Sequence, residues 1–136
     1  MNRRGAAGLL LIAGLSLGLP AGAVAAERIS LNVTATAYNS TDTQTDGSPH
    51  LGAWGDHLDR ALKPGLRVIA VSPDLIEKGL HRGARVRIHG LKGEFVVLDK
   101  MPRRWRNRID IYMHKDVRAA RKWGRRRVKI SWTPAD

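Results

Sequence analysis

The sequence of 136 residues carries 24 lysine and arginine side chains against 12 aspartates and glutamates, so its formal net charge is +12. It contains no cysteine, which excludes thiol chemistry, a disulfide framework and a lipid attached to cysteine. A field this positive attracts polyanions, although a high charge can also serve solubility alone.

The first 26 residues are typical of a secretory signal. Residues 1–4 are positively charged, residues 6–19 are apolar, and small residues follow at Ala23, Ala25 and Ala26. The apolar run is shorter than the roughly 20 residues of a transmembrane helix, and no later segment would span a membrane. We expect residues 1–26 to be removed and residues 27–136 to be a periplasmic or secreted domain. Its polyanions would then be envelope components (cell-wall carboxylates, lipid phosphates or lipopolysaccharide) and not nucleic acid.

The remaining chain predicts a mainly β fold. Residues 29–38 alternate between apolar and polar side chains, as a strand does. Residues 39–66 form a long polar loop, and loops of this length are usually functional. Short helices are expected at 72–80, with Ser72 as N-cap, and at 115–124, ended by Gly124. Further strands are expected at 67–71, 84–90, 93–99, 107–113 and 126–132. Six strands with one or two short helices favour a small closed β-barrel.

Two aspartates are the best candidates for chemistry. Ile109 and Ile111 would face the core, which places Asp110 on the other face, and Asp99 ends the preceding strand. If these strands lie close together, one carboxyl has a raised pKa and can act as an acid near neutral pH. Cleavage of a glycosidic bond requires such an acid. Alternatively, Asp110 forms an ion pair with Arg108, and Asp99 simply begins a loop.

The other candidate groups are arginines and tryptophans. The histidines are scattered and no serine has a nucleophile motif, so we expect neither a metal nor a cofactor. Trp54 and Trp105 could stack on sugar rings, although Trp105 could instead plug the end of the barrel. Arginines pair with carboxylates through two hydrogen bonds. Those expected beside Trp105 are Arg103, Arg104, Arg106 and Arg108.

Six motifs occur in an order that resembles a known family. They are "TATAY" (34–38), "GAWGD" (52–56), "IAVSPDLIEKG" (69–79), "VVLDK" (96–100), "RNRIDIYM" (106–113) and "AARKWGRRRVKI" (119–130). This order resembles the three-aspartate (3D) domain family, which is related to the barrel of membrane-bound lytic transglycosylase A. The resemblance covers nearly all of residues 27–136.

The resemblance implies a six-stranded double-psi β-barrel that cleaves peptidoglycan as a lytic transglycosylase does. Asp110 would protonate the glycosidic oxygen between N-acetylmuramic acid and N-acetylglucosamine and then act as base. Asp99 would adjust the pKa of Asp110 and hold the substrate. The partner would be a peptidoglycan strand, bound by a monomer without metal or cofactor. The residues expected to bind substrate are Tyr38, Trp54, Gly55, Trp105 and Arg108.

The chain departs from the family pattern at three places. The first of the three family aspartates is Ser72 here, with Asp74 two residues later, and the family's D-T-G-G is "DKMP". The threonine of its T-A-x-G motif falls at Gly52. These changes leave open a second function, that of a non-catalytic barrel that binds peptidoglycan or another glycan.

Overall fold

The structure is a computed structural model that describes residues 27–40, 51–59 and 66–134. The expected signal, residues 1–26, and most of the long polar loop lie outside the described residues. The strands are β1 (Ile29–Tyr38), β2 (Leu66–Val71), β3 (Arg85–Ile88), β4 (Glu94–Lys100), β5 (Arg108–Tyr112) and β6 (Arg126–Trp132). The helices are α2 (Pro73–Glu77) and α3 (Val117–Trp123).

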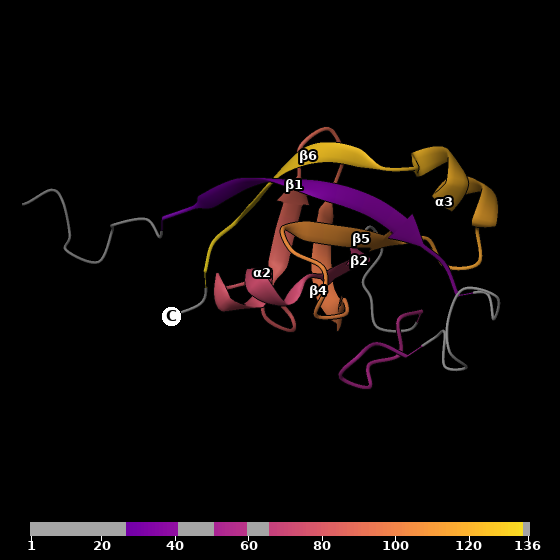
Figure 1. The fold of residues 1–136 in the computed structure, drawn as a ribbon, viewed down its shortest axis with the longest axis horizontal. Helices are drawn as coiled ribbons and strands as arrows, with labels where there is room; N and C mark the ends of the chain where they lie inside the picture. Colours follow the sequence, from indigo (N-terminus) through magenta and orange to yellow (C-terminus); the bar gives the residue numbers. More distant parts are fainter. Residues whose placement is uncertain (1–26, 41–50, 60–65, 135–136) are drawn as a thin grey trace, which may run out of the picture.

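The strands close into a barrel in the order β1-β5-β2-β4-β3-β6 (Figure 1). Two pairs, β1 with β5 and β2 with β4, are parallel, and the other neighbours are antiparallel. The predicted fold class, a mainly β, six-stranded double-psi barrel with two short helices, is confirmed. Because β5 lies between β1 and β2, segments far apart in the sequence become neighbours.

The barrel interior is filled by branched aliphatic side chains. The inward positions of the strands hold Val33, Ile69, Val97, Ile111 and Ile130, all buried. β-branched residues suit a pleated surface packed on one side, which is why these segments form strands. The alternation read from the sequence therefore decides which side chains remain outside.

A second, smaller cluster lies on the outer face of β2, β4 and β5. Val68, Val96, Leu98 and Tyr112 bury Leu58 of the segment 51–59. Fully burying a leucine contributes about 1.5–3 kcal/mol, so this contact holds the segment against the barrel beside the end of β4.

Strand β4 contains a β-bulge that decides the direction of one candidate residue. Val97 pairs with Ile69, but the next pair joins Asp99 to Ala70, so Leu98 is an extra residue. Successive side chains of a strand point to opposite faces. Because Val97 lies in the interior, strict alternation would aim Asp99 inward, whereas the bulge turns it to the outer face.

Both helices are shorter than expected. Helix α2 ends at Glu77 because the chain turns at Gly79, which has φ of 107°. Ser72 does occupy the N-cap position, but its side chain makes no capping bond. Helix α3 packs on β1, where Trp123 Nε1 donates to the carbonyl oxygen of Ala35 at 3.2 Å (Figure 1).

Candidate functional site

Two carboxylates lie on the outer face of the barrel, one on each side of the same residue. Ala70 of β2 pairs with Asp99 of β4 and with Asp110 of β5, and Asp110 pairs with Thr36 of β1. Neighbouring strands lie about 4.8 Å apart, so these positions form one row across four strands. We call Thr36, Tyr38, Asp99 and Asp110 the carboxylate site.

Asp110 is largely withdrawn from water, and this governs its protonation. Its pKa is raised from 3.8 to about 6, chiefly by burial and to a smaller extent by the negative charge of Asp99. The hydrogen bond from Thr36 Oγ1, 2.9 Å from Oδ1, and the positive charge of Arg108 act in the opposite direction. A carboxyl with this pKa can donate and recover a proton near neutral pH. The positive charge of Arg108 is therefore only one of several influences on the protonation of Asp110.

Asp99 accepts hydrogen bonds from three separate segments. Tyr38 Oη donates to Oδ2 at 2.9 Å, and the backbone N–H groups of Ala53 and Lys100 donate to Oδ1 at 2.7 and 2.9 Å. Burial and the charge of Asp99 hold the pKa of Tyr38 well above its usual value, so Tyr38 remains a donor. Asp99 is thus fixed between β1 and the segment 51–59, and it does not merely begin a loop.

Arg108 and Trp105 lie next to Asp110 in the chain and contact each other. The Arg108 guanidinium stacks on the Trp105 ring, 3.9 Å from its centre, and Arg104 approaches the same ring at 5.3 Å. Such stacking orders both side chains. Trp105 is half-buried beside the start of α2 and belongs to neither the interior cluster nor the outer cluster of the described residues. Arg108 Nε is buried without a hydrogen-bond partner.

The segment 51–59 contributes Trp54 and Gly55. Trp54 is half-buried, and Lys100 Nζ lies 5.9 Å from the centre of its ring. Gly55 is exposed, has φ of 88° and donates its N–H to the Gly52 carbonyl. The structure therefore places Trp54 beside the residue that follows Asp99, whereas Gly55 closes a tight turn.

Ser72 and Asp74 hold the loop before β5. Buried Ser72 accepts a hydrogen bond from the Arg108 backbone N–H at 3.0 Å, and Asp74 accepts from the Asn107 N–H at 2.9 Å. Burial opposes ionisation of Asp74, but hydrogen bonds from Ser72 and Asn107 outweigh it and lower the pKa. Ser72, which replaces the first aspartate of the family pattern, and Asp74 thus connect the start of α2 to the loop before β5 and its first residue.

Several interacting groups were not among the expected site residues. Thr36 shares a strand face with Tyr38, which was a usable signal, but only the β1–β5 register shows that it meets Asp110. A second network lies next to the site, since Asp59 Oδ1 accepts from Tyr112 Oη and lies 2.8 Å from His114 Nδ1. The Tyr112 ring packs on Tyr38 at a centroid distance of 5.2 Å. No spacing pattern in the sequence indicates this network.

Within the described part of the chain, no three histidine, aspartate or glutamate side chains lie where they could hold a metal ion. None of the described helices has both the length and the apolar character needed to cross a membrane.

Comparisons with known proteins identify relatives of the fold only. No protein-family model and no curated protein matches the sequence. Among solved structures, the chain is similar to apo expansin from Clavibacter michiganensis, with 18% identity and a TM-score of 0.51, over 79% of this chain and 52% of that chain. A mutant of that expansin in complex with cellohexaose shares 16% identity, with a TM-score of 0.46, over 79% of this chain and 51% of that chain. The chain spans about half the length of these structures, and identity at this level shows a shared fold and nothing finer.

Proposed function

We propose that this chain is a glycan-binding barrel of the cell envelope and that the carboxylate site holds a peptidoglycan strand. The observation that carries the proposal is the bulged register, which places Asp99 and Asp110 on either side of Ala70 on the outer face. Two carboxyl groups and a tyrosine hydroxyl can form directional hydrogen bonds with sugar hydroxyls.

The surroundings of the site suit a chain of sugars that bears carboxylates. Trp54 and Trp105 are half-buried aromatic side chains on the two flanking loops, and a ring can cover the apolar face of a sugar. Arg108 has a buried Nε without a partner, and guanidinium groups pair well with carboxylates such as those of peptidoglycan stem peptides. The motif order that resembles the 3D family supports peptidoglycan over other glycans.

Binding can be tested by co-sedimentation with purified sacculi. We expect Asp99→Ala to lower the retained fraction, because the change removes the acceptor shared by Tyr38 and Ala53. Asp116→Asn on α3 changes the net charge by the same amount. If attraction between a basic protein and anionic sacculi accounted for retention, both variants would bind at least as well as the parent. Full retention of Asp99→Ala would therefore disprove the proposed site.

Cleavage of the strand is a second candidate function, favoured by the pKa of about 6 at Asp110. With that pKa about a tenth of the molecules carry the proton at pH 7. Asp110 would donate it to the glycosidic oxygen as the bond to the muramyl anomeric carbon breaks. It would then take the proton of the muramyl 6-hydroxyl as that oxygen attacks the same carbon, which yields a 1,6-anhydro sugar without water.

Mass spectrometry of soluble material released from sacculi distinguishes the two functions. Cleavage predicts anhydro-muropeptides from the parent and none from Asp110→Asn. Retention of both proteins on the sacculi with no soluble product supports the binding function alone. Equal amounts of anhydro product from both would exclude Asp110 as the acid.

A further inference from the structure

The outer face of β3, β6 and the start of β1 is strongly basic. We call Arg28, Arg85, Arg87, Arg127 and Lys129 the basic face; each is exposed. Counted around the closed barrel, β6 is three strands away from β2 in either direction, so these two strands lie on opposite sides. The basic face therefore lies on the side of the barrel away from the carboxylate site.

Ser131 lies among three cations of this face, Arg28, Arg87 and Lys129. Arg28 Nε donates to Ser131 Oγ at 3.3 Å. Ser131 pairs with Arg87 on β3 and with Ser30 on β1, so the two arginines approach it from opposite neighbouring strands. Lys129 lies two residues away on the same face of β6, about 7 Å along the strand.

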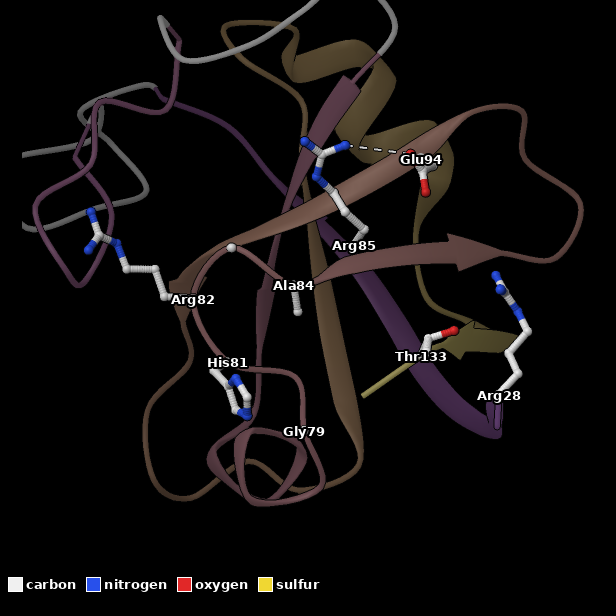
Figure 2. A pocket seen from close by; sticks show the side chains of 9 residues that line it. Arg28, Gly79, His81, Arg82, Ala84, Arg85, Glu94 and Thr133 are labelled. Carbon is white, nitrogen blue, oxygen red and sulfur yellow. Dashed lines mark ion pairs between the residues drawn. The ribbon is translucent and has the colours of Figure 1, made fainter. Parts of the chain in front are cut away.

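Two surface hollows meet at Arg28. One, of about 430 Å³, is bordered by Arg28, His81, Arg85 and Thr133 (Figure 2). The other, of about 360 Å³, is bordered by Arg28, Arg87 and Lys129. Each is large enough for one small charged group, and their shared wall at Arg28 makes them consecutive positions for a linear ligand.

The positive charge of the basic face is largely uncompensated. Among the described residues, the basic face forms one ion pair, in which Arg85 Nη1 lies 3.5 Å from Glu94 Oε1 (Figure 2). Both side chains are about half-exposed. Surface pairs of this kind contribute little. The remaining four cations have no carboxylate partner among the described residues, although Arg28 and Arg127 donate hydrogen bonds to neutral oxygens.

From this arrangement we propose that the basic face binds a linear polymer of phosphate groups. One guanidinium can donate two parallel hydrogen bonds and so pair with both oxygens of a carboxylate. The oxygens of a phosphate point in several directions, so that more than one guanidinium can bind the same group. Arginines that converge from adjacent strands, as Arg28 and Arg87 do, suit the second geometry.

One feature disfavours a lipid surface, and a second disfavours nucleic acid. Leu51, outside the basic face, is the exposed large hydrophobic residue among those described, so no such side chain of the described face could insert into a bilayer. The second is that neither hollow is bordered by a described tryptophan, tyrosine or phenylalanine, so that stacking on bases there would depend on His81 and His89. The basic face would therefore recognise the repeated negative charges of a polymer.

The test measures binding of fluorescent linear polyphosphate at several salt concentrations. We compare Arg87→Gln/Lys129→Gln with Arg118→Gln/Arg121→Gln, which removes the same charge from exposed positions of α3. The first variant should bind about tenfold more weakly, and its dependence on salt should fall by about one ion per side chain removed. The second should match the parent, and so should Asp99→Ala if the carboxylate site binds a different ligand.

Three outcomes would overturn the proposal. Equal losses in both double variants would show that net charge alone attracts the polymer. Binding to phosphatidylglycerol vesicles but not to polyphosphate would identify a lipid surface. Equal affinity for hyaluronate, a linear polycarboxylate, would show that the face does not distinguish phosphate. Since none of these results depends on sacculi, failure here leaves the proposed glycan site to its own test.

Discussion

Burial of Asp110 costs stability when its carboxyl is ionised. Its side chain is withdrawn from water on the outer face of β5, close to a second carboxylate. Thr36 and Arg108 compensate for this environment only in part, because the pKa of Asp110 remains about 6. A residue kept under such conditions is more easily explained by function than by packing.

Replacing Asp110 by asparagine should stabilise the protein in a pH-dependent way. The native carboxyl binds its proton more tightly than the unfolded one, since the pKa rises from 3.8 to about 6. The ionised group therefore destabilises the native state progressively as the pH rises from about 4 through about 6. We expect Asp110→Asn to gain about 2 kcal/mol in free energy of unfolding at pH 7.5 and nothing at pH 3.5. Denaturant titrations at both pH values test this, and an equal effect at both would refute it.

At the scale of elements, the segment 51–59 and strand β4 act as one unit. The bulge at Leu98 turns Asp99 outward, and the Ala53 N–H then reaches its carboxylate. Gly52 permits this contact, because a Cβ there would lie 2.1 Å from the Leu98 carbonyl oxygen. This chain thus has no room for the side chain that the family pattern carries at Gly52.

Gly52→Ala should displace the segment 51–59 from β4. We expect a loss of about 1–3 kcal/mol in stability, the range seen when side chains are forced into packed sites, and a clear loss of binding to sacculi. Asp116→Ala is the control, since it removes the α3 N-cap bond to the Ala119 N–H. That change should cost about 1 kcal/mol and leave binding intact. Equal binding losses in both variants would mean that stability, not the position of Asp99, controls binding.

At the scale of the molecule, the barrel separates two kinds of surface. The carboxylate site lies over β1, β5, β2 and β4, and the basic face lies over β3, β6 and the start of β1. A closed barrel can present both surfaces at once. Under the two proposals above, one molecule could bridge a glycan strand and a phosphate polymer.

Salt should weaken the two proposed interactions unequally. Displacing ions from about three phosphates makes affinity fall about a hundredfold for a tenfold rise in salt. Hydrogen bonds to neutral sugar hydroxyls are nearly insensitive to screening. We therefore expect polyphosphate to dissociate between 0.05 and 0.5 M NaCl, about a tenfold rise, while sacculi retain most of the protein. Parallel salt curves for the two ligands would contradict two separate sites.

Much of the fold could be predicted because it depends on local patterns. Alternation of side chains along 29–38 and 126–132 identifies strands wherever they pair, and Gly124 ends α3 as expected. The sequence also indicates Asp99 and Asp110 as candidates, because a carboxylate within an apolar strand is costly to bury. These features depend on residues near one another in the chain, which is why the sequence alone determined them.

Pairing between strands decided the rest. Asp99 and Asp110 lie on strands that do not pair with each other, and they come within electrostatic range because β2 lies between them. The bulge that turns Asp99 outward has no sequence signature, since "EFVVLD" reads as an uninterrupted strand. Likewise, the cluster around Ser131 joins Arg28 at the start of the described chain, Arg87 in its middle and Ser131 near its end. Direction and proximity across strands depend on register, which tertiary contacts fix and local sequence does not encode.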